Sequence, residues 1–123
     1  MDTRSKIIAG KPASIADPVV VVTGYFDILR AEHARELQSI RERTGARTLL
    51  VIVLPAASSI VPPRARAELV AALRMVDYVV SANDADIQAM IDTFHPTEVV
   101  RLEAADERRT RQWMDDVRRR QTR

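Results

Sequence analysis

The chain has 123 residues, of which 46% are hydrophobic and 29% are charged, and its formal net charge is +2. This length matches one domain, and the composition is that of a globular chain rather than a disordered or membrane-embedded one. The near balance of acidic and basic residues argues against a strong field for polyanions such as nucleic acid. The sequence contains no cysteine, which excludes disulfides, thiolate metal sites and thiol nucleophiles.

Neither a membrane span nor an export signal is expected. The longest apolar run without a charge, residues 48–63, contains two serines and three prolines and is shorter than the roughly 20 residues of a spanning helix. Residues 1–11 lack the apolar stretch of a secretory signal. We therefore expect a cytoplasmic protein.

The first half of the chain predicts a strand, a helix and a second strand. Residues 19–23, Val-Val-Val-Val-Thr, form a β-branched run typical of a strand buried on both faces of a parallel sheet. A helix ending at Thr44-Gly45 should follow, because small or apolar residues recur at near-helical spacing at Leu29, Ala34, Leu37 and Ile40. Residues 48–54 predict another buried strand, which Pro55 ends because proline cannot donate to the ladder.

The second half continues the alternation after a loop at residues 56–63. The apolar spacing predicts a helix from Arg64 with Leu69, Ala72, Leu73 and Val76 on its apolar face, then a strand at 78–80. Asn83 or Asp84 can cap the next helix, whose inner face would be Ile87, Met90, Ile91 and Phe94 and which His95-Pro96 ends.

The C-terminal part predicts one more strand and one more helix. Val99, Val100 and Leu102 indicate a short strand. Residues 104 to about 121 form a charged helix whose docking stripe would be Trp113, Met114 and Val117, and whose last residues, Arg118–Arg120, should fray.

This order of elements favours a Rossmann-like three-layer α/β/α sandwich with a parallel sheet and right-handed crossovers. We expect an N-terminal segment, residues 1–18, followed by a single domain, residues 19–121. In such sheets ligands bind beyond the carboxyl ends of the strands where the strand order reverses. Residues 23–33 are therefore the candidate ligand-binding segment.

Three motifs carry a resemblance to a known family. Residues 23–33, Thr-Gly-Tyr-Phe-Asp-Ile-Leu-Arg-Ala-Glu-His, resemble the signature of the cytidylyltransferase-like nucleotidyltransferases, a strand followed by G-x-F-D-x-L-H-x-G-H and a helix. Residues 66–80 are similar to the family's R-x-x-x-L/V helix running into V-D-x-V-V. Residues 96–101 are similar to its P-D-x-x-V-K segment, with Arg101 at the lysine. The sugar-phosphate and glycerol-phosphate cytidylyltransferases are the branch that the VDYVV segment resembles.

The resemblance implies a nucleotidyltransferase-type fold, with CTP or ATP and a phosphorylated small molecule as ligands and Mg²⁺ as the cofactor of an active enzyme only. Backbone donors at the strand end and the helix N-terminus would hold phosphate, and the family's histidines would add side-chain donors. The implied catalytic positions are His33 and Arg30. The implied nucleotide-binding residues are Gly24, Tyr25, Phe26, Arg66 and Arg101, and no metal-ligating residues are expected.

The motif also departs from the family pattern. Arg30 stands in place of the first histidine, and Glu32 in place of the glycine. A carboxylate about 4 Å from a phosphate would cost roughly 4 kcal/mol at an effective dielectric of 20, unless Glu32 turns outward or pairs with Arg30 or Arg35. The family's lysine-bearing loop is replaced by the neutral residues 55–63, and its serine- and threonine-rich loop by the charged residues 103–110.

Several of these residues also have a structural interpretation. His33 can be a capping or surface residue, Asp27 is taken to hold the turn, and Arg66 and Arg101 can be solvated. The Arg-rich stretch 108–120 is interleaved with acidic residues, which favours a solvated helix face over nucleic-acid binding. Trp113 would anchor its helix either in the core or in a homodimer interface.

Three functional hypotheses follow. The leading one is a degenerate nucleotidyltransferase, a pseudoenzyme that binds a nucleotide or phosphometabolite with weak or no transferase activity. The second is an active, divergent cytidylyl- or adenylyltransferase acting on a phosphorylated small molecule. The third is a protein-interaction scaffold that forms a homodimer or docks on an enzyme.

Overall fold

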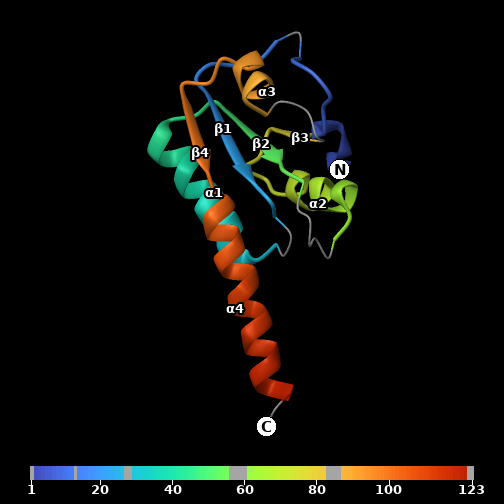
Figure 1. Cartoon of the computed structure of the whole chain (residues 1–123). Coiled ribbons are helices and arrows are strands. Elements are labelled where there is room, and N and C mark those ends of the chain that lie inside the picture. Colours follow the sequence, from blue (N-terminus) through green and yellow to red (C-terminus); the bar gives the residue numbers. More distant parts are fainter. Residues whose placement is uncertain (1, 13, 27–28, 56–60, 83–86, 122–123) are drawn as a thin grey trace.

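The computed structural model describes residues 2–12, 14–26, 29–55, 61–82 and 87–121 (Figure 1). Strands and helices alternate from the first valine run to the C-terminal end. The elements are η1 (Thr3–Lys6), β1 (Val19–Gly24), α1 (Ala31–Thr44), β2 (Thr48–Val53), α2 (Pro63–Ala71), β3 (Tyr78–Ser81), α3 (Ile87–Thr93), β4 (Glu98–Arg101) and α4 (Glu103–Gln121).

The four strands form one parallel sheet in the order β3-β2-β1-β4. The chain moves outward from β1 through β2 to β3 and then returns to place β4 on the other side of β1. The strand order therefore reverses between β1 and β4. Thr23 pairs with Ile52 of β2 and with Arg101 of β4, so the end of β1 lies in the middle of the carboxyl edge.

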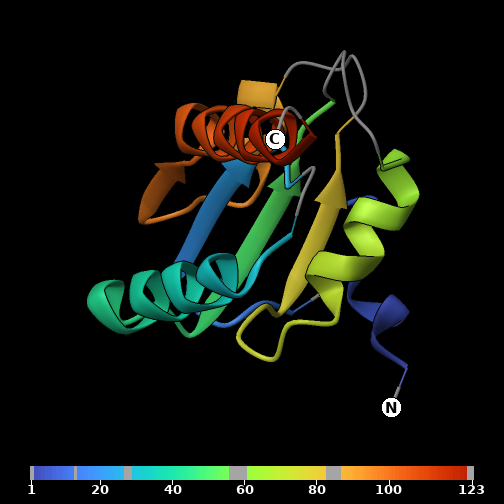
Figure 2. The same cartoon turned by 90° about the horizontal axis from the view of Figure 1, so that it is seen from below.

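Two hydrophobic cores lie on opposite faces of the sheet. Figure 2 shows helices on both of these faces. Val20 and Val22 pack toward α1 and α2, whereas Val21 packs toward α3. Alternate residues of a strand point to opposite faces, so a run of fully buried valines needs a layer of helices on each side. The predicted Rossmann-like sandwich is confirmed.

The helix after β2 differs from its prediction. It begins at Pro63, the last residue of the expected loop, and ends at Ala71, so Leu73 and Val76 follow it in turns. Leu69, predicted on the apolar face, is 45% exposed. The buried face is instead formed by Arg66, Ala67, Val70 and Ala71, which share one side of the helix because they are spaced at one, three and four residues.

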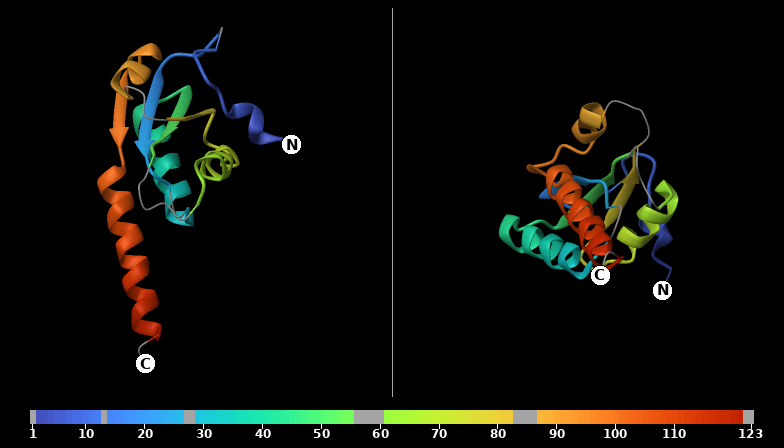
Figure 3. Two further views of the ribbon diagram at one scale, coloured as in Figure 1. Left: turned by 45° about the vertical axis from the view of Figure 1, so that its right-hand side comes forward. Right: turned by 60° about the horizontal axis from the view of Figure 1, so that its bottom comes forward.

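The C-terminal helix departs further from its prediction. α4 starts at the carboxyl edge of the sheet and projects away from the body (Figures 1 and 3). Trp113 is 38% exposed, and neither core contains Trp113, Met114 or Val117. The prediction that this stripe docks on the core is therefore wrong, because α4 contacts the sheet through its start. The helix also continues through Arg118–Arg120 instead of fraying.

The caps proposed at Asn83 and Asp84 lie outside the described residues. Of the helices that are described, none combines the length and the apolar character needed to cross a membrane.

Candidate functional site

The loop after β1 presents two successive backbone donors to one point. The N–H groups of Tyr25 and Phe26 both donate to Oδ2 of Asp106, at 2.9 and 3.3 Å. Phe26 has a left-handed backbone with φ of 50°. Successive N–H groups around a left-handed residue form a concavity that binds anions. The end of β1 thus has the geometry of an anion site.

His33 adds a third donor from the first turn of α1. Its ring is 2% exposed, and its Nδ1 accepts the backbone N–H of Arg30 at 3.0 Å. Because Nδ1 is an acceptor, the proton of the neutral ring is on Nε2, which lies 2.9 Å from Oδ1 of Asp106. The Phe26 ring, 5.7 Å away between centroids, covers one side of the imidazole. We call the N–H groups of Tyr25 and Phe26 and the Nε2–H of His33 the anion cradle.

The anion in this cradle is the protein's own carboxylate. Asp106, in the first turn of α4, is 4% exposed, and the three cradle donors are shared between its two oxygens. Gly24 makes room for it, since a Cβ at that position would lie 2.6 Å from Oδ2 of Asp106 and 2.8 Å from the Phe26 ring. An element about 80 residues away in the sequence therefore fills the site that β1 and α1 build.

Further acidic residues surround the cradle. Glu103 accepts a hydrogen bond from the hydroxyl of Thr23. Burial raises the pKa of the Tyr25 phenol, and the charges of Glu107, Glu103 and Asp106, with a hydrogen bond to Glu107, raise it further. The carboxyl end of β1 is therefore lined with negative charge, which opposes the binding of a triphosphate.

The two motif positions that depart from the family pattern lie beside one another. Nη1 of Arg30 is 3.9 Å from Oε1 of Glu32, and both side chains are partly exposed. This contact matches one of the alternatives stated for Glu32 from the sequence, namely that its carboxylate pairs with Arg30. Arg30 reaches the cradle through its backbone N–H to His33, while its guanidinium lies near Glu32 on a side chain that is 36% exposed.

Arg66 is 1% exposed and is held by backbone carbonyls. Its Nη1 donates to the carbonyls of Tyr25 and Leu54, at 2.6 and 2.9 Å, and its Nε donates to that of Val61 at 3.2 Å. The guanidinium thus joins the segments that follow β1 and β2. Arg66 therefore supports the loop that carries the Tyr25 donor of the cradle. Its contact with a nucleotide stays a prediction.

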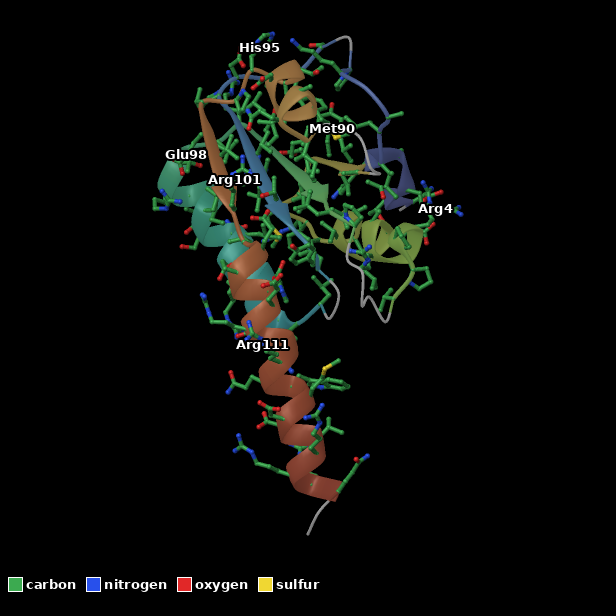
Figure 4. All side chains as sticks on the ribbon, viewed as in Figure 1. Arg4, Met90, His95, Glu98, Arg101 and Arg111 are labelled. Carbon is green, nitrogen blue, oxygen red and sulfur yellow. The ribbon has the colours of Figure 1, made fainter. Side chains whose placement is uncertain are left out.

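Arg101 lies at the end of β4, next to Thr23 in the sheet (Figure 4). Its Nη2 donates to Oε1 of Gln88 on α3 at 3.3 Å. Since α3 covers the face opposite α1, the Arg101 side chain leaves the sheet on the side away from His33. The structure brings Gly24, Tyr25, Phe26 and His33 together but does not bring Arg101 to them. Asp27 lies outside the described residues.

The residues at this end do not fit a magnesium ion. Mg²⁺ takes oxygen ligands, but both carboxylate oxygens of Asp106 accept N–H donors and an oxygen of Glu103 accepts a hydroxyl. Across the described ranges, no group of three or more His, Asp or Glu side chains is arranged to hold a metal.

Sequence reasoning did not identify Asp106 as part of the site. The available signal was the replacement of a serine- and threonine-rich loop by the acidic residues Glu103, Asp106 and Glu107. That change indicates lost phosphate contacts, but a carboxylate at the contact itself follows only from the position of α4.

Comparison with solved structures finds a likeness in fold. The crystal structure of the lipopolysaccharide core biosynthesis protein from Thermoplasma volcanium GSS1 aligns with a TM-score of 0.59 and 23% sequence identity, over 66% of this chain and 70% of that protein. At this identity the likeness establishes a shared fold. No protein-family model matches the chain, and no curated protein does.

Proposed function

We propose that this chain is a degenerate cytidylyltransferase-like nucleotidyltransferase, which binds a nucleotide or phosphometabolite weakly and has weak or no transferase activity. The observation that carries the proposal is the carboxylate of Asp106 in the anion cradle. A biosynthetic setting, drawn from the name of the structural neighbour, belongs to the proposal as well.

The carboxylate of Asp106 and a bound phosphate would compete for the same donors. A phosphate can use the cradle only if Asp106 leaves it, or if the two negative charges share it. Two unit charges about 4 Å apart repel by roughly 4 kcal/mol at an effective dielectric of 20. Since 1.4 kcal/mol is tenfold in affinity, this corresponds to a loss of about a thousandfold. A micromolar nucleotide site would become a millimolar one.

Catalysis should suffer more than binding. Nucleotidyl transfer depends on positioned donors that stabilise charge developing on phosphate oxygens. Nε2–H of His33 is such a donor, but here it is committed to a carboxylate inside the protein. The first histidine of the motif is also absent, because Arg30 stands in its place.

The test compares the wild-type protein with Asp106→Ser, which removes the charge and supplies the kind of side chain that the family carries in this loop. Isothermal titration with CTP and ATP, with and without Mg²⁺, should give millimolar or weaker binding for the wild type and at least tenfold tighter binding for the variant. Asp92→Ser, on the exposed face of α3, is the matched control and should leave binding unchanged.

Pyrophosphate release provides the second readout. Enzyme-like turnover of CTP or ATP by the wild-type protein would overturn the proposal in favour of an active transferase. If Asp106→Ser folds but binds neither nucleotide at millimolar concentration, the nucleotide-binding part of the proposal is wrong.

A further inference from the structure

The anion cradle is buried where α4 begins. Phe26 is 1% exposed, His33 is 2% exposed, and the Asp106 carboxylate that they bind is 4% exposed. The space is already tight, since a Cβ at Gly24 would lie 2.6 Å from Oδ2 of Asp106. A phosphate group is bulkier than a carboxylate, and a close-packed interior has no room for it beside Asp106. A phosphate therefore reaches the donors only when Asp106 withdraws.

Asp106 cannot withdraw far while α4 stays docked. Its carboxyl group is one carbon away from the backbone, and its N–H donates to the carbonyl of Leu102 at 2.8 Å. A change of side-chain rotamer moves the carboxylate oxygens but leaves the Cα and Cβ of Asp106 beside the cradle. Binding of a phosphate thus requires the first turn of α4 to move.

The contacts that keep α4 docked are acidic. Glu103 accepts the hydroxyl of Thr23, Asp106 fills the cradle, and Glu107 is hydrogen-bonded to the phenol of Tyr25. Beyond its first turns α4 projects from the body, and its apolar side chains belong to neither core (Figures 1 and 3). An anion in the cradle would repel all three carboxylates. The bound anion and the docked helix therefore exclude one another.

Leu102 provides a fixed point about which α4 can turn. It is 8% exposed, it packs in the core on the α1 side, and its N–H donates to the carbonyl of Thr23 at 2.8 Å. The helix begins at the next residue, Glu103. Gln112 lies about 15 Å from Leu102 along the helix, so a turn of about 30° moves Gln112 by about 8 Å.

We propose that Asp106 is a displaceable internal ligand, which keeps α4 docked until a phosphate group takes its place in the cradle and releases the helix. The proposal rests on the anion-binding part of the proposed function and adds a conformational response to it. Docking and binding are linked, because the affinity measured for phosphate is reduced by the fraction of molecules in which α4 is open. An open fraction of about 1% weakens phosphate binding about a hundredfold.

Double electron–electron resonance can follow the position of α4. Since the chain has no cysteine, Ser39→Cys on α1 and Gln112→Cys on α4 provide one pair of spin labels at exposed positions. Without added anion the full chain should give one narrow distance distribution. Inorganic phosphate up to about 50 mM should shift and broaden this distribution, whereas NaCl of equal ionic strength should not.

The source of the phosphate group is tested in the same experiment. CTP should release α4 as inorganic phosphate does, and cytidine, which carries no phosphate, should have no effect. A lower midpoint for CTP than for inorganic phosphate would assign the cradle to a nucleotide, and the reverse order would assign it to free phosphate.

Asp106→Ser tests the release of α4 without any ligand. The variant should give a broad distribution in the absence of phosphate and should bind phosphate at least tenfold more tightly than the wild type. Asp92→Ser, on the exposed face of α3, should match the wild type. Cooperative urea unfolding checks that each labelled protein is folded, and the phosphate titration of the wild type does not depend on the variant.

The outcomes separate this proposal from the proposed function. Phosphate binding to the wild type, seen as shifts of the Tyr25 and Phe26 amide resonances, with α4 still in place would overturn the displacement and leave anion binding intact. A narrow distribution in folded Asp106→Ser would also overturn it. If neither protein binds phosphate, the anion-binding part of the proposed function is wrong, and the displacement with it. Transferase turnover would overturn the proposed function alone.

Discussion

Nε2 of His33 and Oδ1 of Asp106 lie 2.9 Å apart, with both side chains almost fully buried, and this contact joins the start of α1 to the start of α4. A buried carboxylate is stable only when it is paired and hydrogen-bonded. Asp106 meets that condition through the same donors that would hold a phosphate. The contact therefore contributes to the stability of this chain and, under our proposal, blocks its ligand site.

Removing the carboxylate should destabilise the protein and leave three buried donors without their acceptor. We expect Asp106→Ala to lower the free energy of unfolding by about 2–4 kcal/mol. Millimolar inorganic phosphate should recover part of this loss, because an anion that binds only the folded state stabilises it. Urea denaturation with and without phosphate measures both effects. Asp92→Ala should change stability by no more than about 0.5 kcal/mol and show no specific phosphate response.

Gly24 should tolerate no side chain. A Cβ there would press on Asp106 and on the Phe26 ring, at 2.6 and 2.8 Å, so Gly24→Ala should destabilise the protein by about 1–3 kcal/mol. Gly10 is the matched control, because a Cβ at that position meets nothing within 4 Å. Thermal unfolding of the two variants compares them. Equal melting temperatures would show that α4 does not pack on Gly24 as described.

Arg66 should not be replaceable by lysine. A single ammonium cannot reproduce the fork that binds the carbonyls of Tyr25, Leu54 and Val61. We expect Arg66→Lys to cost about 2–3 kcal/mol by chemical denaturation. Arg64→Lys, whose exposed guanidinium pairs with Glu68 one turn away, should cost less than about 0.5 kcal/mol. A small effect at both positions would argue against the structural role of Arg66.

Tyr25 should ionise at higher pH than a free phenol, since burial and the neighbouring carboxylates disfavour its phenolate. Because the pKa of Tyr25 is raised in the folded state, its stabilising contribution is fully present below the ordinary phenol pKa of 10.0 and is lost as pH rises through the folded pKa. Phenolate absorbance of Tyr78→Phe, which leaves Tyr25 as the only tyrosine, measures the titration. Adding Glu107→Gln should lower the pKa of Tyr25, and an unchanged titration would contradict the contact with Glu107.

Much of the fold could be predicted because its signals are local. The valine run of β1 and the apolar run of β2 require helices on both faces, and the alternation of strands and helices predicts a parallel sheet. The helix after β2 was less predictable. Its buried face includes Arg66, which no hydrophobic pattern places in a core, and Leu69 is consequently turned outward.

The sequence by itself determined the strand–helix order and the position of the candidate site at residues 23–33, since both depend on short-range patterns of side chains and turns. Only the tertiary structure decided that Asp106 occupies that site and that α4 starts beside β1 and projects away from the body. Asp106 reaches the cradle because β4 ends beside β1 and α4 starts there, a contact between residues about 80 positions apart. Pairing over such a separation is decided by the packing of the whole sheet, and no local pattern in the Glu103–Gln121 segment encodes it.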